Sequence, residues 1–187
     1  MTAAALRSLT SRVSGWTILA FVAGIALITF SAKVQVPFWP VPMTLHTLAV
    51  MMIAVAGGPR FAVATFLGYL ALGAAGLPVF SGSPERGVGL AYMAGPTGGY
   101  LVGYLMASWL TGTLAQSRGV LGRFGAMLAG LAVVYAAGLA WLALYAPADK
   151  LLMLGLYPFV LGDLFKIAVV AFGASFVPAR WLGRDAR

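Results

Sequence analysis

The chain has 187 residues, of which 61% are hydrophobic and 9% are charged, with a formal net charge of +8. A soluble domain carries roughly a quarter charged residues, so the chain's 4 acidic side chains cannot cover a globule in water. This composition excludes an ordinary soluble enzyme and predicts a single membrane domain over residues 1–187. We therefore expect the lipid bilayer, and not nucleic acid, as the partner of the basic side chains.

Apolar runs along the chain predict its helices, since a membrane-spanning helix needs about 20 mostly apolar residues. The runs predict six transmembrane helices at about residues 16–32, 44–58, 60–77, 98–116, 121–145 and 158–177. The second is short for a full crossing. Residues 147–156 predict a short interfacial helix, with Asp149 in its first turn and Gly155 as its stop. The expected fold class is an all-α membrane protein.

The basic residues predict the orientation. With a cytoplasmic N-terminus, the inner side carries Arg7, Arg12, Arg60, Arg118, Arg123, Arg180, Arg184 and Arg187, and the outer side carries Lys33, Arg86 and Lys150. This asymmetry follows the positive-inside rule, so both termini are expected in the cytoplasm. The proline- and glycine-rich segments 33–43 and 78–97 then lie outside. Irregular backbone of this kind suits a cavity that opens outward.

Small residues in the first helix, Ala20, Ala23 and Gly24, permit another helix to approach closely. The sequence leaves open whether that helix belongs to the same chain or to a partner.

The second helix begins with Thr44, which suits a helix cap, and with His46, the one histidine of the chain. A lone histidine is more often a hydrogen-bonded structural group than a metal ligand, so no metal site is expected. In the outer segment, Arg86 either attracts an anion or is simply a solvated charge. The aromatic residues available to line the outer end of a site are Phe80, Tyr92, Tyr100 and Tyr157.

The fourth helix is entered through Gly95-Pro96-Thr97-Gly98-Gly99-Tyr100. Backbone N–H groups near Gly98 could hold a carboxylate or carbonyl, and the alternative is a tight entry with small residues for packing. The chain contains neither G-x-x-x-x-G-K-[ST] nor G-x-S-x-G. We therefore expect neither ATP hydrolysis nor a serine hydrolase, and no cofactor.

Two charges lie within the last apolar run, Asp163 and Lys166. Their i, i+3 spacing directs both side chains to one helix face, and charges at membrane depth are costly and usually functional. The alternative is an ion pair that only neutralises itself. The functional interpretation is a polar cavity floor that presents both a donor and an acceptor to a urea-like or amide-like group.

Four segments together resemble the BioY family, the biotin-specific S components of energy-coupling factor (ECF) transporters. They are Val41-Pro42-Met43-Thr44-Leu45, Gly76-Leu77-Pro78-Val79-Phe80, Gly95-Pro96-Thr97-Gly98-Gly99-Tyr100, and Pro158-Phe159 with Gly162-Asp163-Leu164-x-Lys166. The resemblance extends from about residue 16 to 177. It departs at His46, where glutamine is expected more often.

The resemblance implies a six-helix S-component fold that captures biotin at the outer side of a prokaryotic plasma membrane. It also implies partners, namely a transmembrane coupling protein and two ABC-type ATPases. By the same resemblance, Asp163 and Lys166 help to bind biotin, and Ala20, Ala23 and Gly24 contact the coupling protein. Solitary transport by an oligomer, without the ATPase module, stays open as the alternative.

Overall fold

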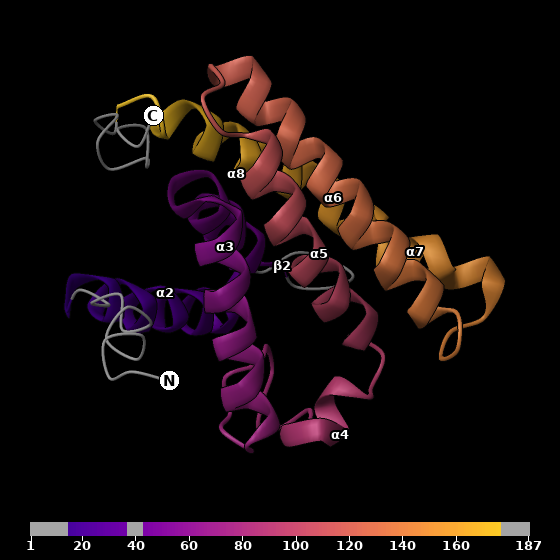
Figure 1. Ribbon diagram of the computed structural model, residues 1–187. Helices are drawn as coiled ribbons and strands as arrows, with labels where there is room; N and C mark the ends of the chain where they lie inside the picture. The colour runs from indigo at the N-terminus through magenta and orange to yellow at the C-terminus, as the bar shows by residue number, and fades with distance from the viewer. Residues whose placement is uncertain (1–14, 37–42, 177–187) are drawn as a thin grey trace, which may run out of the picture.

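The structure, a computed structural model, describes residues 15–36 and 43–176 and is mostly helical (Figure 1). Its long helices are α2 (Gly15–Lys33), α3 (His46–Ala74), α5 (Gly98–Leu114), α6 (Val120–Leu142) and α8 (Tyr157–Gly173). The shorter elements are strands β1 (Gln35–Val36) and β2 (Met43–Thr44), helices α4 (Gly89–Met93) and α7 (Leu151–Gly155), and the 3-10 turn η1 (Ala148–Lys150).

Helix α3 consists of two antiparallel arms. Gly58 has a φ of 72°, a conformation that glycine adopts easily, and Pro59 follows without a backbone N–H, so the helical ladder breaks here. A straight helix would hold His46 and Phe66 about 30 Å apart, yet their ring centroids are 6.0 Å apart. The arms, 46–57 and 59–74, therefore lie side by side. With α2, α5, α6 and α8 they give six helices, which confirms the predicted fold class.

Several helix ends differ from the predicted bounds. The second arm of α3 stops at Ala74 and not at residue 77, because Gly76 adopts a φ of 95° and the N–H of Leu77 donates to the carbonyl of Leu72. These contacts form a Schellman-type C-cap. Helix α6 ends at Leu142 instead of 145, and the predicted helix at 147–156 is divided between η1 and α7. The short helix α4 and the antiparallel β1–β2 pair were not predicted.

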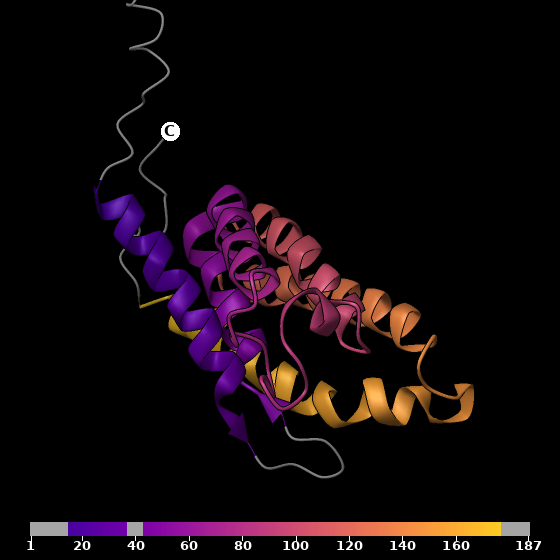
Figure 2. The same ribbon diagram turned by 90° about the horizontal axis from the view of Figure 1, so that it is seen from below.

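The connections gather at two opposite ends of the bundle. Because successive helices alternate in direction, the chain after Lys33, Ala74 and Leu142 lies at one end, which we call the outer end. The turn at Gly58 and the 115–119 connection lie at the other. Figure 2 shows α7 and α8 running nearly in line along one side. Most of the arginines that decide the predicted orientation (Arg7, Arg12, Arg180, Arg184 and Arg187) lie outside the described residues, so cytoplasmic termini stay a prediction.

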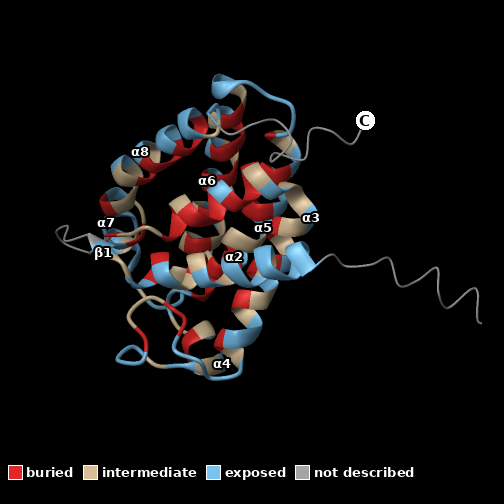
Figure 3. Ribbon diagram, turned by 90° about the vertical axis from the view of Figure 1, so that its left-hand side faces the viewer, coloured by how far each residue is buried: buried red, intermediate tan, exposed pale blue. Residues whose placement is uncertain are grey.

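Buried residues face the centre of the helix bundle, whereas many large apolar residues are exposed on its outside (Figure 3). Helices α5 and α6 approach so closely that a Cβ on Gly103 would come within 2.8 Å of the Cα of Val134. Outward-facing residues include Phe30, Trp109 and Phe165, and apolar patches of this extent are unfavourable in water. By length and composition alone, four described segments could cross a membrane: α2, α6, Ala148–Gly173, and α3 when its two arms are counted as one stretch. The chain is a multi-pass membrane protein.

Candidate functional site

A cavity of about 240 Å³ lies between α3, α5, α6 and α8 and is covered by the 75–97 segment. Seven of the ten predicted binding residues line it, namely Thr44, His46, Arg86, Tyr92, Tyr100, Asp163 and Lys166. Other residues that line the cavity were not predicted, and those with polar side chains are Thr47, Tyr69, Ser81, Thr97, Tyr104 and Tyr135. The role of all of them in binding stays a prediction.

Polar side chains from three helices line the cavity, each at a similar distance from the outer end of its own helix. Tyr69 lies five residues before the outer end of α3, and Tyr104 and Asp163 each lie six residues after the outer start of their helices. At about 1.5 Å of rise per residue, all three lie about 7–9 Å inside the outer helix ends. The short first arm of α3 begins at this depth, because His46 packs on Tyr69 with ring centroids 5.5 Å apart. The cavity therefore has a polar layer below its opening.

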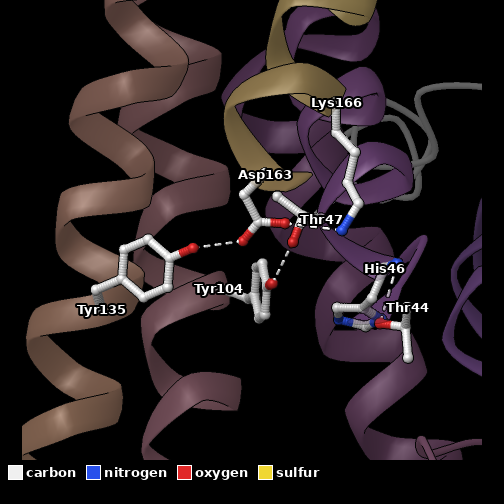
Figure 4. Close-up of polar contacts among 7 residues, drawn as sticks. All are labelled: Thr44, His46, Thr47, Tyr104, Tyr135, Asp163 and Lys166. Atoms are coloured by element: carbon white, nitrogen blue, oxygen red, sulfur yellow. Dashed lines mark hydrogen bonds and ion pairs between the residues drawn. The ribbon is translucent and has the colours of Figure 1, made fainter. Parts of the chain in front are cut away.

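The charged pair lies in this layer (Figure 4). Lys166 Nζ is 2.8 Å from Asp163 Oδ1, and the hydroxyl of Tyr135 donates to Asp163 Oδ2 at 2.7 Å. Both charged residues are buried, at 4% and 6% exposed. Burying such charges costs free energy that their attraction must offset, and the second donor from α6 further stabilises the carboxylate. The two charges thus neutralise each other and also line the cavity, and their role in binding stays a prediction.

A second polar pair joins α3 to α5. The hydroxyls of Thr47 and Tyr104 are 2.5 Å apart, and Figure 4 shows them between Tyr135 and His46. Tyr104 could have been found from the sequence, because it follows Tyr100 by four residues on the same helix face. Tyr135 could also have been found from the sequence, since a tyrosine within an apolar span needs a partner for its hydroxyl.

The 75–97 segment forms the outer wall of the cavity. Hydrogen bonds within the chain hold this segment in place. The ammonium of Lys33 donates to the carbonyl of Ser83 at 2.5 Å and to its hydroxyl at 2.9 Å. Tyr92 donates to the carbonyl of Ser81 at 2.8 Å, and burial raises the pKa of Tyr92 above its ordinary value, so this hydroxyl stays protonated. The segment brings Arg86, an exposed residue, to the edge of the cavity.

Three predicted binding residues do not line the cavity. Phe80 is fully buried and stacks on Tyr92 with centroids 4.7 Å apart, so it supports a lining ring from behind. Tyr157 is 64% exposed on the outer surface. The N–H of Gly98 donates to the carbonyl of Gly95 at 3.0 Å, and a Cβ at Gly98 would come within 3.2 Å of Trp141 Nε1. The tight helix entry is therefore the better interpretation of Gly98.

The cap predicted at Thr44 is only partly present. Its hydroxyl accepts a bond from the N–H of His46 at 3.4 Å, which is long for a hydrogen bond. Leu45 occupies the N-cap position itself, and Thr44 pairs with Gln35 in the two-stranded sheet. Thr44 thus joins the end of β2 to the start of α3 at the cavity wall.

The small residues of α2 face two directions. Gly24 is buried, and a Cβ there would come within 2.8 Å of Thr65 Cγ2, so Gly24 permits the close packing of α2 on α3. Ala20 and Ala23 are exposed. Of the three residues predicted to contact a partner, Gly24 serves internal packing, and the two alanines are accessible to a partner.

These features define a helical membrane protein with a buried cavity for a small molecule, apolar in its walls and polar in one layer. Comparison with known proteins identifies the family. The BioY family model matches residues 5–182, so the chain belongs to the BioY family.

Individual relatives agree with this assignment. The "Probable biotin transporter BioY" of Pyrococcus horikoshii is 36% identical over 151 residues, 81% of this chain and 89% of that protein. The "Biotin transporter BioY" of Thermotoga maritima is 37% identical over 148 residues, 78% of this chain and 86% of that protein. The fold also matches a crystal structure of the S-component for biotin from an ECF-type ABC transporter, with a TM-score of 0.71, 26% identity, and coverage of 92% of this chain and 91% of that chain.

Proposed function

We propose that this protein is the biotin-binding S component of an ECF-type uptake transporter in a prokaryotic plasma membrane. It captures biotin at the outer face and delivers it together with a transmembrane coupling protein and two ABC-type ATPases. It acts as a transporter subunit rather than an enzyme and has no resident cofactor. Membership of the BioY family and the names of the relatives support this proposal. The observation that carries it is the polar layer of Asp163, Lys166 and Tyr135 inside the cavity of a matching fold.

The chemistry of the cavity fits the parts of biotin. Biotin has an apolar bicycle and tail, a ureido group with N–H donors and a carbonyl acceptor, and a carboxylate. Small-molecule sites are typically apolar with a few polar groups that fix orientation. The buried layer with Asp163 and Lys166 suits the neutral ureido group. The exposed Arg86 suits the carboxylate, because a charge at the cavity edge loses less hydration than one in the buried layer.

Replacing Arg86 with glutamine should weaken biotin binding by about tenfold or more, because a charge-assisted bond to the carboxylate is lost. Binding of biotin amide, whose carboxylate is replaced by a neutral amide, should change much less. Lys150→Gln is the matched control, since Lys150 is an exposed cation at the same end that does not line the cavity. Equilibrium binding of both ligands to the purified protein measures these effects. An equal loss for biotin and its amide would contradict the role of Arg86.

The partnership with the ATPase module can be tested apart from binding. Labelled-biotin uptake is measured in cells that express this chain with and without a coupling protein and its ATPases. We expect accumulation that needs the module and stops when the ATPases are inactivated. Accumulation that persists in cells without coupling proteins would favour the alternative, solitary transport by an oligomer.

The exposed side of α2 is the proposed contact for the coupling protein, through Ala20 and Ala23. Small side chains there let a partner helix approach closely within the bilayer.

A further inference from the structure

His46 carries two polar atoms that nothing in the described part of the chain satisfies. Its Nδ1 and Nε2 are both buried without a hydrogen-bond partner, and the residue is only 7% exposed. A buried polar atom without a partner is costly, and such atoms are rare in folded proteins. Because His46 lines the cavity, a molecule inside the cavity can supply the missing partner.

The neighbours of His46 are already engaged elsewhere. Its ring lies 4.7 Å from the ring of Tyr104 and 5.5 Å from that of Tyr69. The hydroxyl of Tyr104 is paired with Thr47, and that of Tyr69 donates to the carbonyl of Val79. The ammonium of Lys166, which also lines the cavity, is paired with Asp163. The aromatic rings fix the position of the imidazole, and its nitrogens are left for a ligand.

The imidazole at this position is neutral, because a second cation beside Lys166 would be buried among aromatic rings without a partner of its own. A neutral imidazole offers one N–H donor and one acceptor nitrogen. A cyclic urea offers the complementary pair, a carbonyl acceptor and N–H donors. A carboxylate fits this layer less well, since it would lie near the negative charge of Asp163 while Lys166 is already neutralised.

We propose that His46 binds the ligand directly and determines its specificity, by hydrogen-bonding the cyclic urea of biotin beside Asp163 and Lys166. This inference rests on the proposed function, and it assigns His46 a role that a structural histidine does not have. The cyclic urea is held between α3 and α8, with the imidazole on one side and the charged pair on the other.

The test compares His46→Phe, which keeps the ring packing but removes both nitrogens, with His46→Gln, which keeps a donor and an acceptor. His46→Phe should weaken biotin binding by about tenfold or more, the effect of one lost buried hydrogen bond. His46→Gln should bind within a few-fold of the unmodified protein. The thermal unfolding midpoint of ligand-free His46→Phe should be unchanged or higher, because the variant buries no unsatisfied nitrogen. If His46→Phe does not fold, His46→Leu can replace it, because leucine also lacks both ring nitrogens.

A spectroscopic measurement separates ligand contact from a structural role. The chain has 1 histidine, so protein labelled with ¹⁵N-histidine and prepared without a histidine tag gives the signals of one imidazole. Biotin should shift these ring signals, and inorganic phosphate should not.

Unshifted signals in the presence of bound biotin, or unchanged affinity in His46→Phe, would overturn the proposal while leaving biotin transport intact. Lower stability of ligand-free His46→Phe with unchanged intrinsic affinity would also overturn it, by showing a structural role. Failure of the unmodified protein to bind biotin would instead refute the proposed function.

Discussion

Replacing Asp163 with alanine should reduce biotin affinity by at least about a hundredfold, or nearly 3 kcal/mol. The carboxylate accepts from both Lys166 and Tyr135, so its loss leaves a buried ammonium without a counter-charge and a hydroxyl without an acceptor. Removing one partner of a buried ion pair typically lowers the free energy of unfolding by about 3–5 kcal/mol, because the remaining charge is left uncompensated. Lys166→Ala should have a similar effect, because it leaves the carboxylate uncompensated. Binding of labelled biotin to the purified variants measures both.

Loss of binding must be separated from loss of folding. The double variant Asp163→Asn with Lys166→Met removes both charges and so leaves neither unpaired. We expect it to remain folded in detergent, as judged by a monodisperse elution profile, and still to bind biotin poorly. Asp149→Ala is the matched control, because Asp149 is an exposed carboxylate at the same end and does not line the cavity. Unchanged affinity in both single variants and in the double variant would rule out the charged pair as a binding group.

Gly24→Leu should destabilise the isolated protein, whereas Ala23→Leu one residue earlier should not. A Cβ at Gly24 already falls 2.8 Å from Thr65 Cγ2, and overpacking of this kind typically costs about 1–3 kcal/mol. For a chain of this size, that corresponds to a loss of several degrees in the unfolding midpoint. Ala23 is exposed and has room for the larger side chain. Thermal unfolding in detergent measures the difference, and equal midpoints would show that α2 does not pack on α3 through Gly24.

The same surface gives a test of assembly. Ala20→Trp and Ala23→Trp should keep the stability and the biotin affinity of the isolated protein and impair its co-purification with a coupling protein. Full co-purification by both variants would argue against the exposed side of α2 as the contact. Gly24 is unsuitable for this test, because a larger residue there disturbs internal packing first.

The helical architecture was accessible from the sequence because the bilayer imposes a strong pattern. Long apolar runs and their separation by polar or glycine-rich segments placed the six helices, and the break predicted between 44–58 and 60–77 falls at the Gly58–Pro59 turn within α3. The charged pair could also be predicted from the sequence, because Asp163 and Lys166 are two charged residues within an apolar span. Their shared helix face followed from spacing alone.

The remaining parts of the cavity depend on contacts between helices far apart in the sequence. Tyr135 reaches Asp163 from α6, and Thr47 meets Tyr104 across α3 and α5, and no local pattern encodes such pairings. For the same reason Phe80 was assigned to the lining, although it packs one layer behind it. Gly24 and Ala23 could not be separated either, because which side of α2 faces α3 depends on tertiary packing.

Biotin recognition is tested most directly by equilibrium binding of biotin to the purified protein, compared with riboflavin and thiamine under the same conditions. We expect saturable binding of biotin with one site per chain, little or no binding of the other two vitamins, and loss of the biotin signal in Asp163→Ala. Equal binding of all three vitamins, or no binding of biotin by a folded protein, would contradict this expectation.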